Sequence, residues 1–235
     1  MKRFVEYLSL ALAVLLCAGS CMDVDSPIST GTVICNVINS IRLQDDAGEY
    51  LNIVETAIGT IPDTIKRAMI NCDVLVQHED DANEYDIRLL EYAPVTIAEP
   101  VLASGTSEEE LGSDALDISL WGSGGYLNSF TSFTSLKDSD TEHEFNLVLD
   151  DTRSGADTLY LRFTHNAFGE SYDNPDADVS KIQESGKYFS YDLDKFIPSG
   201  QQSIVLYIEY ESFVTSSSVI LRDKETKSGY LKFNR

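Results

Sequence analysis

The sequence LYLRFTH, residues 159–165, alternates between two kinds of side chain and decides how this chain is expected to fold. Leucine, phenylalanine and histidine occupy one parity, while tyrosine, arginine and threonine occupy the other. Residues 142–149, EHEFNLVL, alternate in the same way. Because successive side chains of a β-strand point to opposite faces of its sheet, both stretches are predicted to be half-buried strands.

Similar runs, separated by turn residues, cover most of the chain. In the first half they lie at residues 32–38, 41–44, 50–54, 67–76 and 85–89, a density of short strands that fits a small barrel. Arg67 falls on the polar face of its run, together with Asn71 and Asp73. Further runs at 116–121, 126–133, 188–193, 203–210, 218–222 and 229–233 predict an antiparallel β-sandwich.

Prolines and a glycine interrupt the pattern at residues 94–107, so residues 95–107 are predicted to form a linker or crossover. The predicted domains are therefore a barrel at 32–100 and a sandwich at 101–235.

The composition excludes several classes of protein. The chain has 235 residues, 39 acidic and 17 basic, with a net charge of −22, and 43% of its residues are hydrophobic. A disordered acidic tail would be poorer in apolar side chains. Nucleic acid is excluded as a partner because binding to a phosphate backbone requires clustered lysine and arginine.

Residues 1–20 have the features of a signal peptide, with Lys2 and Arg3 before an apolar run and small residues before Cys21. The apolar run is too short to span a bilayer as a helix. Two processing routes fit the sequence. Either Cys21 is acylated and becomes the N-terminus of a lipoprotein with an acidic tether at 21–31, or ordinary cleavage produces a secreted protein.

Two cysteines, Cys35 and Cys72, remain after the signal and the lipidation candidate. Both fall on the apolar side of predicted strands. They could form a disulfide if their Cα atoms lie within roughly 7 Å, or they could be two small buried thiols.

The sequence contains no recognised catalytic or phosphate-binding motif, so we expect neither an enzyme nor a cofactor. His143 and His165 share the apolar parity of their strands and are expected to pack in the core, with Asn166 capping the strand end. Asp173, Asp176 and Asp178 are weak candidates for a calcium site. The favoured interpretation is an ordinary surface turn, and no metal is expected. Three tyrosines near that loop could stack on a sugar ring: Tyr172, Tyr188 and Tyr191.

Four segments together resemble a known family. They are WGSGGYLN (121–128), HEFNLV (143–148), LYLRFTHNA (159–167) and FSYDL (189–193). In this order, after a lipoprotein signal, they resemble the NigD-like lipoproteins of the Bacteroidota, with Trp121, Tyr126, His143, His165 and Asn166 as structural motif residues. The resemblance implies an OB-like barrel followed by an immunoglobulin-like sandwich. Relatives continue after His-Asn-Ala with Gly-Asp, whereas this chain has Phe168-Gly169-Glu170 and therefore departs from the family pattern at that aspartate.

These observations predict a non-catalytic binding or interaction module of the cell envelope. Cys21 would anchor it to the outer membrane, facing either the cell surface or the periplasm, and the resemblance implies an association with bacteriocins. The alternative is a glycan-binding lipoprotein of an outer-membrane uptake system. The sequence does not decide between a protein and a glycan as the partner.

Overall fold

A computed structural model of the protein describes residues 27–78, 83–172, 174, 176, 178–216 and 219–234. Within these ranges the chain is almost entirely β-strand, which confirms the predicted all-β fold class and its C-terminal β-sandwich. Among the described residues, no helix has the length and apolar character needed to cross a bilayer. The predicted signal peptide and Cys21 lie outside the described ranges.

The first five strands close into a small barrel. They are β1 (Ser29–Asn39), β2 (Arg42–Asp45), β3 (Tyr50–Thr56), β4 (Arg67–Gln77) and β5 (Glu84–Ala98). They follow the order β3-β2-β1-β4-β5, and a parallel pairing of β3 with β5 completes the circle. One parity of each strand fills the interior with a cluster that includes Leu43, Ile70 and Leu89. The barrel therefore has a hydrophobic core of its own.

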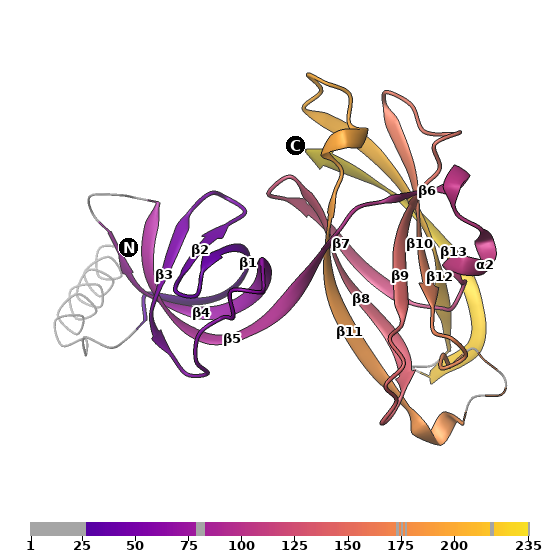
Figure 1. The fold of residues 1–235 in the computed structure, drawn as a ribbon, viewed down its shortest axis with the longest axis horizontal. Coiled ribbons are helices and arrows are strands. Elements are labelled where there is room, and N and C mark those ends of the chain that lie inside the picture. Colours follow the sequence, from indigo (N-terminus) through magenta and orange to yellow (C-terminus); the bar gives the residue numbers. More distant parts are fainter. Residues whose placement is uncertain are drawn as a thin grey trace, which may run out of the picture.

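Eight further strands build the sandwich, which lies beside the barrel in Figure 1. They are β6 (Val101–Leu102), β7 (Asp117–Ser123), β8 (Tyr126–Leu136), β9 (Glu144–Leu149), β10 (Thr158–Asn166), β11 (Ile182–Asp192), β12 (Ser203–Ser216) and β13 (Val219–Asn234). β11, β8 and β7 continue the sheet of β5, and the opposite sheet has the order β13-β12-β10-β9-β6. Leu159, Leu161 and Phe163 of β10 point into the core between the sheets. Three pairings in the sandwich, β10 with β12, β6 with β9 and β5 with β11, are parallel, which the expected antiparallel sandwich did not include.

Strand β5 belongs to both halves of the molecule (Figure 1), so the linker predicted from residue 95 is wrong for residues 95–98. The strand pairs with β4 as far as Pro94, and from Val95 to Ala98 it pairs with β11. Pro94 has no N–H to donate and occupies the position where the strand changes partner. The following β-branched residues favour an extended backbone.

The predicted tether is also shorter than expected, because β1 already begins at Ser29. Thr30 lies opposite Asp73 of β4, and its Oγ1 donates a hydrogen bond to that carboxylate at 2.5 Å.

A short helix, α2 (Glu108–Leu111), follows β6 and begins with a capping box between Ser107 and Glu110.

Arg67 falls on the polar face of β4, yet its side chain is fully buried where the barrel meets the sandwich. Its Nη2 donates to both carboxylate oxygens of Asp46 at 2.7 Å, and its Nη1 donates to Asn36 at 2.8 Å. Its Nε donates to Ser190 Oγ of β11, also at 2.8 Å. The ring of Tyr126 lies 4.5 Å from the guanidinium carbon. Residues of both halves therefore share one guanidinium, and the sandwich excludes water from it.

The β7–β8 hairpin completes this junction. Gly124 and Gly125 have φ values of +57° and +78°, as a two-residue hairpin turn with positive φ at both central positions requires. A Cβ atom at Gly124 would lie only 2.3 Å from Asp46 Oδ1. Ser123 Oγ donates a short hydrogen bond to Asp46 and accepts one from Asn128 Nδ2 at 2.8 Å. The segment WGSGGYLN thus docks the sandwich onto the barrel.

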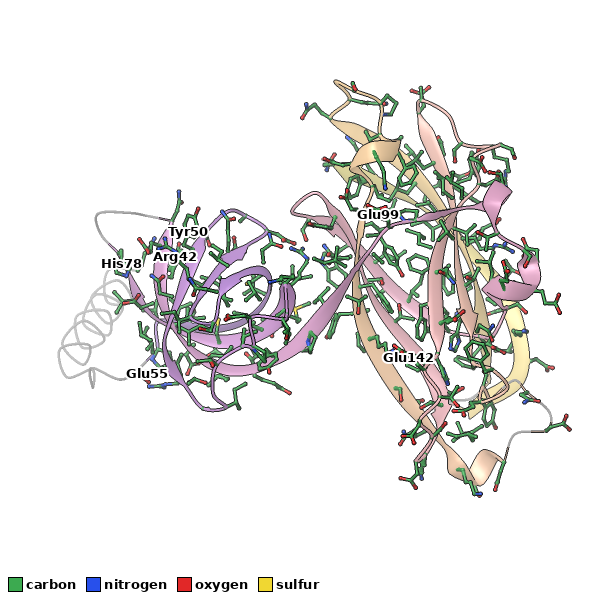
Figure 2. All side chains as sticks on the ribbon, viewed as in Figure 1. Arg42, Tyr50, Glu55, His78, Glu99 and Glu142 are labelled. Atoms are coloured by element: carbon green, nitrogen blue, oxygen red, sulfur yellow. The ribbon has the colours of Figure 1, made fainter. Side chains whose placement is uncertain are left out.

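We predict that Arg67→Met lowers the free energy of unfolding by about 3–5 kcal/mol, because it leaves the carboxylate of Asp46 buried without its cation. Urea denaturation followed by circular dichroism measures the change. The matched control is Arg42→Met, since Arg42, which is labelled on the barrel in Figure 2, makes a partly exposed ion pair with Glu84 at 3.3 Å. Such pairs contribute less than about 1 kcal/mol. Equal losses in the two variants would contradict the proposed role of Arg67.

Candidate functional site

A row of three tyrosines crosses the outer face of the five-stranded sheet. The strand register pairs Tyr160 of β10 with Tyr207 of β12, and Tyr207 with Tyr230 of β13. Their ring centroids are 5.3 and 5.0 Å apart. Tyr160 and Tyr207 each lie between two core residues, and Tyr230 precedes Leu231, which packs against the core, so the pleat directs all three tyrosines outward. We call Tyr160, Tyr207 and Tyr230 the tyrosine row.

The row has one cationic end and one exposed end. The guanidinium carbon of Arg153, on the β9–β10 loop, lies 4.3 Å from the ring centroid of Tyr160 and 5.9 Å from that of Tyr207. The Tyr207 hydroxyl donates to Glu209 at 2.9 Å. At the opposite end, Tyr230 is 73% exposed. The row therefore presents the ring of Tyr230 to solvent, while Arg153 and Glu209 at the other end are held in place by contacts with the row.

A pocket of about 270 Å³ adjoins the cationic end of the row. Its charged lining residues are Glu108, Asp150, Arg153, Arg162 and Glu209, and Tyr160 forms part of its wall. Arg162 donates to Glu108 at 2.6 Å, and this hydrogen bond holds the pKa of Glu108 below its usual value. Carboxylate acceptors and guanidinium donors thus line one concavity next to an aromatic ring.

His143 and His165 form a separate, buried pair, 6% and 0% exposed. His143 Nδ1 lies 3.0 Å from His165 Nε2, and His165 Nδ1 lies 3.3 Å from the carbonyl oxygen of Ala115. Because a carbonyl only accepts, we assign the proton of His165 to Nδ1, so that its Nε2 accepts from His143 Nδ1–H. The remaining nitrogen of His143, Nε2, then carries no proton while the ring is neutral.

Glu170 faces that nitrogen and was missed by the sequence reasoning. Its Oε2 lies 3.7 Å from His143 Nε2, and its Oε1 accepts from the hydroxyls of Ser139 and Thr141, each at 2.5 Å. Burial opposes the charge of Glu170, but hydrogen bonds from Ser139 and Thr141, together with the electrostatic influence of His143, outweigh it, and the pKa of Glu170 is lowered. Glu170 is thus the acidic partner of the histidine pair, two residues beyond Phe168.

The other predicted motif residues have local roles. Asn166 ends β10, and its Oδ1 accepts from the backbone N–H of Phe168 at 3.0 Å. Trp121 lies opposite Asn128 in the β7–β8 hairpin, and Tyr126 contacts Arg67 at the junction described above.

Of the two alternatives for Cys35 and Cys72, the structure shows two free, buried thiols and no disulfide between them. In the β1–β4 pairing Cys35 lies opposite Ala68, while Cys72 lies opposite Gly31. Four residues of register separate the two cysteines, about 13 Å at the usual rise of a strand, which exceeds the reach of a disulfide. Burial, with a smaller contribution from Asp73, raises the pKa of Cys72 to about 11.

The acidic loop and its tyrosines do not form a common site in the described part of the chain. Asp173 lies outside the described residues, and Asp178 Oδ1 accepts from Ser180 N at 3.1 Å. Within the described ranges no three His, Cys, Asp or Glu side chains converge as metal ligands would. Tyr191 is buried in the sandwich core, so the expectation that it stacks on a sugar is wrong. Tyr230 of the tyrosine row, in contrast, is 73% exposed.

The histidine pair predicts a pH dependence of stability. Burial lowers the pKa of His143, and its contact with Glu170 only partly opposes this. Below the ordinary histidine pKa of about 6.5, the unfolded chain therefore binds more protons than the folded chain, and stability falls as the pH falls. We expect the free energy of unfolding to decrease from pH 7 to pH 5, and His143→Gln to reduce this decrease. His78→Gln, at a half-exposed histidine, is the control, and an unchanged decrease in the His143 variant would contradict the assignment.

Comparison with solved structures shows the same fold in proteins of low sequence identity. A protein of unknown function from Bacteroides vulgatus aligns with a TM-score of 0.64 and 18% identity, over 88% of this chain and 92% of its own. A NigD-like immunity protein from Bacteroides caccae gives 0.58 and 18%, over 84% and 91%. A protein from Bacteroides fragilis, provisionally designated a lipoprotein, gives 0.56 and 16%, over 88% and 98%. Comparison with curated proteins gives no match.

The family comparison agrees with the four motif segments, which lie in the sandwich. The model of the NigD-like C-terminal β-sandwich domain matches residues 99–221. These residues include the docking hairpin, the histidine pair and two of the three tyrosines of the row. The chain therefore belongs to the NigD-like family.

Proposed function

We propose that this protein is a lipid-anchored, non-catalytic binding protein of the cell envelope, and that the tyrosine row and its adjoining pocket are the ligand site. The observation that carries this proposal is the stacking of Arg153 on Tyr160 at the rim of the pocket. Aromatic and arginine side chains dominate the energetics of many recognition surfaces. Here they lie on a sheet, so their positions are set before any ligand arrives.

The anchor is inferred from the sequence around Cys21 and is supported by the relative from Bacteroides fragilis that is provisionally designated a lipoprotein. Seven residues separate Cys21 from the start of β1 at Ser29. Even fully extended, they would span no more than about 25 Å. An anchored chain would thus hold its barrel close to the membrane, which we propose to be the outer membrane.

The barrel itself is proposed to be OB-like. Its closed order and the parallel pairing of β3 with β5 support this assignment. With a net charge of −22, the protein would repel a phosphate backbone, so we do not propose nucleic acid as its ligand.

Replacing the anchor residue tests the location. In cells expressing Cys21→Ala, we expect the protein to leave the membrane fraction and become soluble, because the acyl chains are lost. Protease treatment of intact cells then distinguishes the two membrane faces: a surface protein is cleaved, whereas a periplasmic one is protected. Retention of the variant in the membrane fraction would disprove lipidation at Cys21.

The partner is proposed to be associated with bacteriocins, as the designation of the Bacteroides caccae structure as an immunity protein supports. Deletion of the gene should then increase sensitivity to bacteriocins from neighbouring strains. The wild-type gene should restore resistance, and the Cys21→Ala gene should not. Unchanged sensitivity of the deletion strain would argue against this association. The alternative, a glycan-binding lipoprotein of an outer-membrane uptake system, has the same anchor and site and differs in the ligand.

A further inference from the structure

We infer that the tyrosine row and its pocket bind uncharged sugar rings of an oligosaccharide. This inference rests on the glycan-binding alternative of the proposed function and narrows the ligand of its site to one class of sugar. A pyranose ring has a face of C–H groups and a rim of hydroxyl groups, so it needs an aromatic surface next to mixed donors and acceptors. The outer face of the five-stranded sheet presents an aromatic surface and mixed hydrogen-bonding groups within two strand spacings of each other.

The aromatic half of this requirement is met at Tyr230. Its ring is 73% exposed, and it continues the row formed by Tyr160 and Tyr207. Cross-strand packing stabilises a sheet, but a tyrosine as exposed as Tyr230 gains little from burial. From Tyr230 to Tyr160 the row spans about 10 Å, two strand spacings. That length suits a short oligosaccharide better than a single ring.

The polar half is met in the pocket. A sugar hydroxyl both donates and accepts hydrogen bonds, and the pocket offers acceptors on Asp150 and Glu209 beside donors on Arg153 and Arg162. These groups are held by other side chains: Glu108 binds Arg162 at 2.6 Å, and the Tyr207 hydroxyl binds Glu209 at 2.9 Å. Preorganised groups of this kind lose little entropy when a ligand binds.

The charges decide which sugars fit. The pocket is lined by three carboxylates (Glu108, Asp150 and Glu209) and two guanidinium groups (Arg153 and Arg162), so it has no excess of positive charge. The net charge of −22 adds long-range repulsion of anions. A uronic acid or a sulfated sugar would therefore be disfavoured, whereas a neutral hexose carries no charge to repel.

Affinity electrophoresis in native gels tests the inference with defined probes. Gels contain hydroxyethylcellulose, galactomannan, starch or xyloglucan as neutral polysaccharides, and polygalacturonate as the charged one. We expect at least one neutral polysaccharide to retard the full mature chain, and polygalacturonate not to. Tyr230→Ala removes the exposed ring and should weaken binding about tenfold. Arg153→Met should also weaken it.

The matched control is Arg42→Met. Arg42 stacks on Tyr50 of the barrel, with its guanidinium carbon 4.6 Å from the ring centroid, and Figure 2 shows this pair at the far side of the barrel from the sandwich. Its loss should leave retardation unchanged. Circular dichroism and urea denaturation of each variant show whether it is folded, and Tyr230→Leu replaces Tyr230→Ala if the latter is not.

Several results would overturn the inference. Retardation by none of the neutral polysaccharides, or by polygalacturonate alone, rejects neutral sugars as ligands. Retardation that persists in both Tyr230→Ala and Arg153→Met rejects this site. Binding of a bacteriocin peptide that these two variants abolish, with all polysaccharides inert, assigns the site to a peptide instead. The Cys21→Ala fractionation and the bacteriocin-sensitivity assay decide the proposed envelope function independently of these gels.

Discussion

The buried guanidinium of Arg67 is the constraint on which the arrangement of the two halves depends. A charge removed from water must find opposite charge and hydrogen-bond partners, or the folded state loses several kcal/mol. The barrel provides Asp46 and Asn36, and the sandwich provides Ser190 and the ring of Tyr126. Asp46 in turn binds Ser123 at the tip of the docking hairpin. One ionic cluster therefore specifies how the hairpin meets the barrel, which apolar packing alone would define less sharply.

The sequence predicts local structure well here and tertiary partners poorly. Alternation is a property of one strand, so β10 was predicted within a residue or two at each end. The same alternation put Arg67 on a polar face, which is correct for the barrel considered alone. That face is dry only because the sandwich covers it, and no periodicity within β4 reports a neighbour more than 100 residues away. The continuity of β5 was missed for a related reason, since Pro94 is typical of a linker and also of a strand that changes partner.

In the candidate site, too, the sequence predicts the local strand structure but not the neighbouring strands. Tyr160 and Tyr207 each lie between two apolar residues and Tyr230 precedes one, Leu231, so the outward direction of the three tyrosines follows from the sequence. Their alignment into one row depends on the parallel pairing of β10 with β12, which a pattern of antiparallel strands does not suggest. Tyr191 was misjudged because Phe189, Tyr191 and Leu193 form the inward parity of β11 and its continuation, where a tyrosine fills the core as phenylalanine would. The position of a tyrosine in its strand and the pairing of that strand, more than the residue type, decide whether it lies on the proposed recognition surface or in the core.

The shared strand β5 also limits how far the chain is modular. A cut between residues 100 and 101, where a domain boundary would be placed from the sequence, leaves residues 95–98 on the barrel fragment. The sandwich fragment would then lose the strand that covers β11, and the backbone N–H and C=O groups opposite Val95 to Ala98 would form an open sheet edge. Exposed edges recruit other strands and promote aggregation. The sandwich is therefore a self-contained fragment only when β5 is kept with it, although β5 also closes the barrel.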